Sequence, residues 1–168
     1  MIDVRQATTA GELDDARALI RAFAAWHRDT HVEDLDLIER YFDAAAFEEE
    51  LATLPGKYAP PRGSLRVAYD GATPLGCVAM RDMGGSVCEM KRMFVPEAAR
   101  GRGVGRRLAE QIISDARTAG YRLMRLDTSK RQGDAMRLYE QTGFARIPPY
   151  YPLPYDVKDW LVFFELAL

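Results

Sequence analysis

The chain has 168 residues, of which 48% are hydrophobic and 29% are charged, and its formal net charge is −2. A chain of this length can bury roughly 70% of the surface of its unfolded form, so we expect one domain with one core. The composition argues against a general nucleic-acid binder, which should be basic overall. It also argues against a membrane protein, because no apolar run approaches the ~20 residues that cross a bilayer.

The charge is unevenly distributed along the chain. Residues 1–60 hold thirteen Asp and Glu against six Lys and Arg, a net of −7, and residues 61–168 hold twelve against seventeen, a net of +5. One interpretation is that the acidic residues of the first part lie on solvated helix faces and that the basic excess of the second part is accidental. The other is a basic half that holds a polyanionic cofactor beside an acidic half that attracts a cationic substrate. The sequence leaves both open.

Two cysteines are too few for a disulfide framework. If their strands form a hairpin that turns at residues 84–85, Cys77 lies opposite Arg92 and Cys88 lies opposite Arg81. We therefore expect two reduced, buried thiols. The first residues lack the basic region and apolar stretch of a signal peptide, so we expect a cytoplasmic protein.

Hydrophobic periodicity predicts the elements of the first part of the chain. A short strand at residues 2–6 precedes a helix, whose start matches a capping box formed by Thr9 and Glu12. A second helical stretch covers residues 35–54 and breaks near Asp43.

The rest of the chain predicts three strands in an antiparallel meander, followed by alternating helices and strands. The expected strands are residues 65–69, 75–81, 86–95, 121–127, 144–147 and 160–168. The expected helices are residues 103–119 and 135–142, and residues 148–155 form a loop rich in proline and tyrosine. The pattern indicates a mixed α/β fold in a single domain, residues 1–168.

The most informative segment joins the third meander strand to the following helix. It alternates glycines with other residues and adds arginines: Arg100, Gly101, Arg102, Gly103, Val104, Gly105 and Arg106. Glycine permits positive φ and lets a ligand approach the backbone. Free amides and the positive end of the helix dipole then form an anion site. The pyrophosphate of a nucleotide or coenzyme fits this chemistry.

Other phosphate-binding loops fit less well. A P-loop needs Gly-Lys-Ser/Thr, but Gly105 is followed by Arg106. A dinucleotide fingerprint that starts at Gly101 needs a sixth-position glycine, and Arg106 stands there. Kinase glycine loops lie in hairpins instead of preceding helices. A flexible basic loop would explain neither the strand before the segment nor the helix after it.

The segment resembles the coenzyme A motif of the GNAT superfamily of acetyl-CoA-dependent N-acetyltransferases. The core of that motif is Arg or Gln, two residues, Gly, one residue, and Gly or Ala, which Arg100, Gly103 and Gly105 match. Residues 89–96, EMKRMFVP, resemble the central strand of the superfamily, and residues 135–144, AMRLYEQTGF, resemble its second signature. Two motifs at the expected separation make the resemblance specific.

This resemblance covers about residues 65–168 and implies a single-domain GNAT fold. In that fold, helices flank a mixed central sheet whose fourth and fifth strands splay apart, and the pantetheine arm of acetyl-CoA lies in the gap. Many relatives carry Asn seven residues before the signature tyrosine, where this chain has Gln132. The cofactor-binding residues that the resemblance implies are Met93, Phe94, Val95, Arg100 to Arg106, Gln132 and Ala135.

Two residues are candidates for acid–base roles. Tyr139 matches the general acid of the family, which protonates the departing thiolate, although it could be a core aromatic on the face of Ala135. Glu89 is our candidate base, directly or through water, because it shares the strand parity of Met93 and Val95. A surface ion pair with a neighbouring arginine is the alternative for Glu89.

Two histidines and a set of aromatic residues each allow a functional and a structural interpretation. His27 and His31 share a helical face, but a zinc-protease motif needs Glu after the first histidine and Arg28 follows, so we expect no metal. Core packing competes with a substrate-pocket role for a set of aromatic residues. The set is Trp26, Tyr41, Phe42, Phe47, Tyr150, Tyr151 and Tyr155.

The function expected from the resemblance is transfer of an acetyl group from acetyl-CoA to a primary amine, by direct attack. A small-molecule amine is the expected acceptor, with no nucleic-acid partner and no membrane. The alternatives are a protein or peptide N-acetyltransferase, and a non-catalytic CoA-binding regulatory module. The sequence leaves open whether the chain forms a homodimer.

Overall fold

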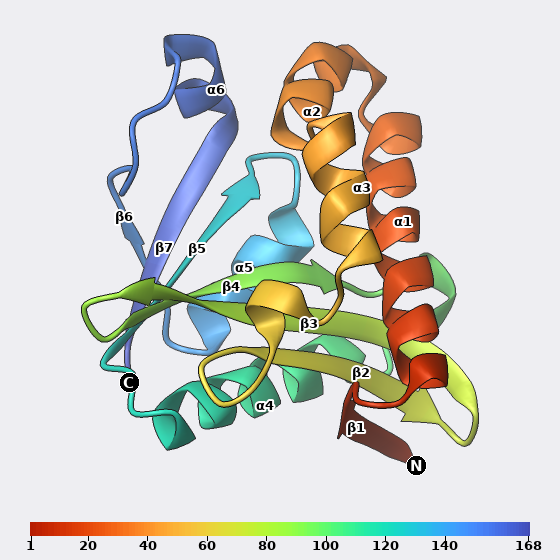
Figure 1. Ribbon diagram of the computed structural model, residues 1–168. Helices are drawn as coiled ribbons and strands as arrows, with labels where there is room; N and C mark the ends of the chain where they lie inside the picture. The colour runs from red at the N-terminus through yellow and green to blue at the C-terminus, as the bar shows by residue number, and fades with distance from the viewer.

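The computed structural model describes residues 1–168 and contains one seven-stranded sheet with the order β1-β2-β3-β4-β5-β7-β6 (Figure 1). The strands are β1 Ile2–Gln6, β2 Ser64–Asp70, β3 Thr73–Gly84, β4 Val87–Phe94, β5 Leu123–Ser129, β6 Ala145–Ile147 and β7 Leu161–Ala167. The helices are α1 Ala10–Thr30, α2 Leu35–Tyr41, α3 Ala44–Ala52, α4 Val104–Thr118, α5 Gly133–Gln141 and α6 Tyr155–Trp160. None of the helices is both long and apolar enough to cross a membrane.

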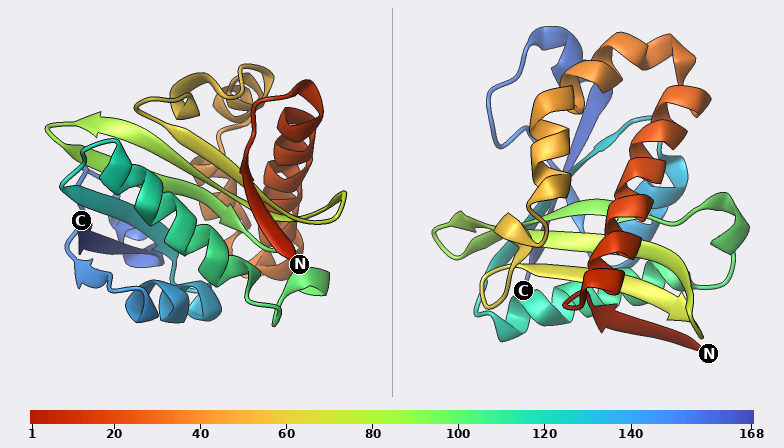
Figure 2. Two further views of the ribbon diagram at one scale, coloured as in Figure 1. Left: turned by 90° about the horizontal axis from the view of Figure 1, so that it is seen from below. Right: turned by 45° about the vertical axis from the view of Figure 1, so that its right-hand side comes forward.

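Helices cover both faces of the sheet and divide the core into two clusters. Helices α1, α2 and α3 stand on one face, and α4 lies across the other (Figures 1 and 2). Successive strand residues point to opposite faces, so Cys77 and Ala79 of β3 pack under α1, whereas Val78 and Met80 pack against the α4 side. Both cysteines are buried free thiols, as expected.

The sheet opens between β4 and β5. These two strands run parallel and pair only at their beginnings, from Val87 opposite Leu123 to Glu89 opposite Arg125. Beyond that point they diverge (Figure 1), while β5 stays paired with β7 along its whole length. The expected splay of the fourth and fifth strands is therefore present. Near its end, β4 therefore has no strand partner on the β5 side, although it stays paired with β3.

The β3–β4 hairpin differs from the expected register. Gly84 pairs with Val87, so the two-residue turn is Gly85–Ser86 and not Gly84–Gly85. Both turn residues have positive φ, 59° and 64°, as a tight hairpin of this kind requires. This turn alone would place Cys88 opposite Met83, but a register shift between Asp82 and Gly84 places Cys88 opposite Asp82 and not opposite Arg81. The expected pairing was wrong because Ser86, a residue that rarely adopts positive φ, occupies the second turn position, and because β3 takes an extra residue next to the turn.

A β-bulge in β4 changes which way its last residues face. Ala79 pairs with Lys91 and Cys77 with Phe94, so β4 carries one extra residue between these pairs. Arg92 lies in the bulge with φ of +56°, the left-handed conformation that bulges use. Beyond it, Met93 packs on the α4 side of the sheet.

The expected helices form, with one addition. The Thr9–Glu12 capping box of α1 is present, and Asp43 separates α2 from α3 and caps α3 by accepting from the amide of Ala46. The loop predicted over residues 148–155 is followed by the short helix α6, which sequence reasoning missed. Its six residues are too few to show a helical period.

Candidate active site

A groove of about 640 Å³ runs between the glycine-rich loop and the start of α5. Of the twelve predicted cofactor-binding residues, eleven line it. They are Met93, Phe94, Val95, Arg100, Gly101, Gly103, Val104, Gly105, Arg106, Gln132 and Ala135. The exception is Arg102, whose guanidinium turns away to pair with Asp70 at 2.6 Å. The groove thus gathers residues from two sequence motifs that lie some thirty positions apart.

The start of α4 leaves backbone amides without a capping group. Gly101 and Gly103 have φ of +74° and +78°, and Gly103 is the N-cap of α4 without a capping side chain. The amides of the first helical turn therefore have no intrahelical acceptor. No acidic residue lies in that turn. Arg100 donates from Nε to the Val95 carbonyl at 3.1 Å and stacks on the ring of Trp26 at 5.0 Å.

A second, smaller cavity of about 40 Å³ lies next to the groove. Met93 and Gln132 line both spaces, so the two meet where β4 and β5 have separated. The cavity walls come from α1, α2, β4, β5, α5 and α6. Its polar and ionisable lining residues are His27, Tyr41, Lys91, Arg92, Asp127, Thr128, Ser129, Gln132, Tyr139 and Trp160.

Tyr139 reaches this cavity from α5. Its side chain is buried, with the rings of Phe144 and Phe164 each 5.9 Å away, so it belongs to the core as well as to the cavity wall. Burial raises the pKa of Tyr139 well above its ordinary value, and the nearby Asp127 adds to the effect. The phenol is therefore protonated at neutral pH, which a proton donor requires.

Glu89 lies in a different place from the one expected. The bulge at Arg92 gives Glu89 and Met93 opposite orientations, so the parity argument for a shared orientation is wrong. Glu89 is 1% exposed, and it accepts hydrogen bonds from Arg81 Nε at 2.8 Å and from the Tyr150 hydroxyl at 2.5 Å. An ion pair with a neighbouring arginine was the alternative interpretation for Glu89, and the pair with Arg81 is present. It is not a surface pair, because the Glu89 carboxylate is buried.

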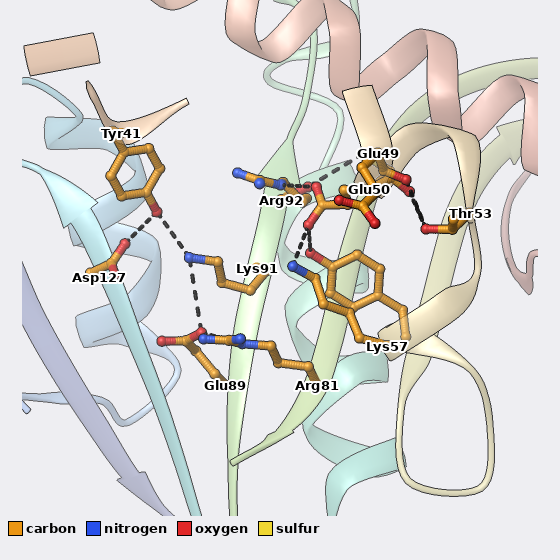
Figure 3. A network of polar contacts seen from close by, with 12 residues as sticks. Tyr41, Glu49, Glu50, Thr53, Lys57, Arg81, Glu89, Lys91, Arg92 and Asp127 are labelled. Atoms are coloured by element: carbon orange, nitrogen blue, oxygen red, sulfur yellow. Dashed lines mark hydrogen bonds and ion pairs between the residues drawn. The ribbon is translucent and has the colours of Figure 1, made fainter. Parts of the chain in front are cut away.

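Sequence reasoning missed Asp127, the carboxylate that lines the cavity. It accepts hydrogen bonds from the hydroxyls of Tyr41 and Tyr151, each at 2.6 Å. These two tyrosines belong to α2 and to the loop before α6, so Asp127 ties two walls of the site together. Lys91 donates to the Tyr41 hydroxyl at 3.1 Å, which extends the network toward Glu89 (Figure 3). The sequence did offer a signal for Asp127, because this carboxylate lies near the end of β5, one of the two strands that splay apart.

The aromatic candidates divide between cavity, groove, surface and core, and the core holds Phe47, Tyr150 and Tyr151. Tyr41 and Phe42 line the cavity, Trp26 lines the groove, and Tyr155 is 80% exposed. Gln132 holds its place through its side-chain oxygen, which accepts from the Thr128 hydroxyl at 2.8 Å.

The two histidines lie side by side at the C-terminal end of α1, with ring centroids 5.7 Å apart. No group of three or more His, Cys, Asp or Glu side chains that could hold a metal ion is present. His27 is buried, and burial together with the neighbouring His31 lowers the pKa of His27 to about 4. Its imidazole is therefore neutral at pH 7.

Comparison with known proteins shows which family the chain belongs to. A sequence profile of the acetyltransferase (GNAT) family matches residues 20–144. The chain belongs to this family. Its relatives include an N-acetyltransferase of Schizosaccharomyces pombe, 43% identical over 64% of this chain and 68% of that protein. They also include a protein named IAA acetyltransferase from Azospirillum brasilense, 41% identical over 56% of this chain and 62% of that protein.

Solved structures share the fold of this GNAT chain. An acetyltransferase from Streptococcus agalactiae superposes with a TM-score of 0.74 at 19% identity, covering 99% of this chain and 98% of that one. The PaiA N-acetyltransferase of Thermoplasma acidophilum, solved with coenzyme A, gives 0.73 at 12% identity, covering 100% of this chain and 99% of that one. Family and fold together support acyl transfer as the chemistry of this chain.

Proposed function

We propose that residues 1–168 form one N-acetyltransferase domain that moves an acetyl group from acetyl-CoA to the primary amine of a small molecule. The observation that carries the proposal is the junction of two spaces at Met93 and Gln132. A long groove with an anion site at one end meets a smaller cavity that is lined by the phenol of Tyr139. A donor and an acceptor that enter from opposite sides would meet at this junction.

The groove fits coenzyme A. Uncapped amides at the start of α4, together with Arg100 and Arg106, suit a pyrophosphate. The end of β4, Met93 to Phe94, has no strand partner on the β5 side, so its backbone groups there are available to a chain of amides such as pantetheine. When bound, acetyl-CoA supplies the acetyl group as a thioester.

The protein must then manage two protons and one developing negative charge. The acceptor ammonium loses a proton before its nitrogen attacks, because a lysine-like amine with pKa near 10.4 is neutral in only about one molecule in 10³ at pH 7. The carbon–nitrogen bond forms and the carbon–sulfur bond breaks. Backbone amides near Met93 would stabilise the carbonyl oxygen, and Tyr139 would donate a proton to the departing sulfur.

Two carboxylates are candidates for the base. Glu89 is the candidate from sequence, and its buried position requires a relay through Lys91, Tyr150 or water. Asp127 lines the cavity itself and needs no relay. Each of its oxygens accepts one phenolic hydrogen bond and keeps a lone pair for the acceptor nitrogen.

The size of the cavity favours a small acceptor. About 40 Å³ has room for on the order of three water molecules. Elements from α1, α2 and α6 enclose it, so a protein terminus would have to displace them.

A release assay tests the proposal. Free thiol is measured after mixing the protein with acetyl-CoA and, in separate reactions, polyamines, amino acids, aminoglycosides and peptides. We expect amine-dependent thiol release with at least one small-molecule group and none with peptides. Release only with peptides would make the chain a protein or peptide N-acetyltransferase. Coenzyme A binding without release under any condition would make it a non-catalytic binding module.

A further inference from the structure

Arg92 has an unusual position in the acceptor cavity. It lies in the β4 bulge with φ of +56°, a conformation that is uncommon for a residue with a side chain. Its side chain is only 10% exposed and lines the cavity. Residues held in sparsely populated backbone conformations often mark functional sites, provided that an independent observation points the same way.

The guanidinium of Arg92 is held on one edge only. Nε donates to Glu50 at 2.8 Å, which is the only hydrogen bond that the guanidinium makes within the protein. The rings of Phe42 and Phe47 lie 5.2 and 5.6 Å from its central carbon and fix its plane. Arg92 extends from Glu50 on one side toward Tyr41 on the other (Figure 3). Its two terminal nitrogens are therefore free to bind a ligand.

The terminal nitrogens of Arg92 have no protein partner, yet they are not among the completely buried unpartnered side-chain atoms, so they face open space in the cavity. A guanidinium presents its terminal N–H groups as a planar fork that matches the two oxygens of a carboxylate. The missing partner of Arg92 is thus best supplied by a planar anion that enters the cavity.

The charge balance around Arg92 points the same way. Glu50 is its only carboxylate partner, and Glu50 also pairs with Lys57 at 2.7 Å and accepts from the Tyr58 hydroxyl at 2.6 Å. Two cations therefore share one carboxylate. The cavity wall itself carries two cationic side chains, Lys91 and Arg92, and one carboxylate, Asp127. Glu89 lies 3.9 Å from Lys91 behind the wall, but it is already paired with Arg81.

We propose that the acceptor is an amino-carboxylate, a small molecule of the amino-acid class. Its carboxylate binds the terminal nitrogens of Arg92, with the ammonium of Lys91 nearby. Its amino group lies toward Asp127 and Tyr139, on the side where the cavity meets the groove. This inference rests on the proposed function and names the class of acceptor that the same site takes.

The alternative of a purely cationic acceptor fits the cavity poorly. A polyamine would bring further positive charge against Lys91 and Arg92 in a water-poor space, where repulsion between like charges is strong. The acidic N-terminal half does not change this, because its carboxylates in the site are already paired. Glu50 is neutralised by Arg92 and Lys57, and Asp34 by Arg131 at 2.9 Å.

Matched acceptors provide the first test. Thiol release from acetyl-CoA is measured with amino acids and, for each, the amine without the carboxylate and the carboxamide. We expect kcat/KM to fall on the order of 10²-fold from the acid to either analogue, because a site built for hydrogen bonds discriminates against a ligand that lacks them. Equal rates for the three would overturn the inference while leaving acetyl transfer intact. No release with any amine would instead count against the proposed function.

Variants provide the second test and a control. Arg92→Lys keeps the charge but loses the fork, so KM for the amino acid should rise 10- to 100-fold, with a much smaller change for the matched amine. Arg66→Lys makes the same exchange at a partly buried guanidinium that binds Asp115 through two nitrogens, away from the cavity. It should leave the preference for acids unchanged.

Melting temperature and coenzyme A affinity are measured for both. An unaltered preference in a folded Arg92→Lys protein would contradict the assignment, and if that variant fails to fold, the matched acceptors alone decide.

Discussion

Tyr139 on α5 and Met93 on β4 line the same cavity, although β4 lost its pairing with β5 at Glu89, four residues before Met93. The splay of the strands is what lets a side chain from α5 face the end of β4. Because Met93 also lines the groove, the phenol lies near the point where a thioester in the groove would meet an amine in the cavity.

We therefore expect Tyr139→Phe to lower kcat by 10²- to 10⁴-fold, the usual contribution of a positioned general acid. The change removes only the hydroxyl, which makes no hydrogen bond within the protein, and it preserves the packing against Phe144 and Phe164. Melting temperature and coenzyme A affinity should stay close to those of the wild type. Steady-state rates and a thermal melt measure both.

Tyr121→Phe is a matched control, because this buried tyrosine donates to the Arg62 carbonyl at 2.7 Å and lies outside both spaces. It should cost about 1 kcal/mol of stability and leave kcat unchanged. The effect of Tyr139→Phe should also shrink with an acyl donor whose leaving group is more acidic. Full activity of the Tyr139→Phe protein would remove this residue from the mechanism.

The anion site at the start of α4 gives a second prediction. Gly103→Val places a β-branched side chain at φ of +78°, where the local backbone must change. We expect the affinity for coenzyme A to fall at least 10-fold, because the amides of the first turn move out of line. Isothermal titration measures this, and the wild-type affinity should weaken with added salt.

Gly120→Val separates backbone strain from binding. Gly120 follows α4 with φ of +84°, and at both glycines a Cβ would meet no atom within 4 Å. Both variants should therefore lose a similar amount of stability, on the order of 1–3 kcal/mol. Only Gly103→Val should lose coenzyme A. Equal affinities in the two variants would show that the loop does not hold the phosphates.

Local patterns allowed most of the fold and the groove to be predicted from sequence. The glycine–arginine segment, the capping box of Thr9 and the break at Asp43 each depend on neighbouring residues, so their signals are complete in the sequence. The same holds for the Leu138-Tyr139 signature on α5.

The cavity depends on features that no local pattern contains. The bulge at Arg92 reversed the orientation expected for Glu89, because a two-residue period continues only until a strand takes an extra residue. Arg102 turned toward Asp70, a choice between two anions that only the folded chain settles. Asp127 is held in the site by hydrogen bonds from tyrosines that are 86 and 24 residues away in the sequence.

The two carboxylates give a third prediction. Asp127→Asn should lower kcat/KM by on the order of 10²-fold or more at pH 7, with partial recovery at alkaline pH where more of the amine is neutral. Glu89→Gln removes a carboxylate that does not line the cavity. We expect it to cost stability, because the Arg81 guanidinium loses its charged partner, while its pH–rate profile keeps the wild-type shape.

Profiles of kcat/KM from pH 6 to pH 10 distinguish the two residues. A profile altered only in Glu89→Gln would assign the base to the relay through Lys91 or Tyr150. Two unaltered profiles would leave deprotonation to solvent. Coenzyme A affinity should stay unchanged in both variants, because neither carboxylate lines the groove.

The last prediction concerns stability against pH and depends on His27. Burial, with a smaller effect from His31, lowers the pKa of His27 to about 4 from an ordinary 6.5. Between these values the unfolded chain binds a proton that the folded chain does not, so the free energy of unfolding falls as pH falls through this window. The loss from His27 should be about 2 kcal/mol between pH 7 and pH 5.

His27→Phe keeps an aromatic ring beside Phe23 and Phe42 and cannot be protonated. Urea unfolding at pH 7 and pH 5 should therefore show a smaller loss in His27→Phe than in the wild type, by about that amount. Glu50 does not interfere in this pH range. Burial alone would raise the pKa of Glu50, but the charge of Arg92 outweighs burial and lowers this pKa to about 2. The stabilisation from Glu50 is therefore lost only below about pH 4.5. Identical losses in the two proteins would mean that the His27 ring is solvated when it takes up a proton.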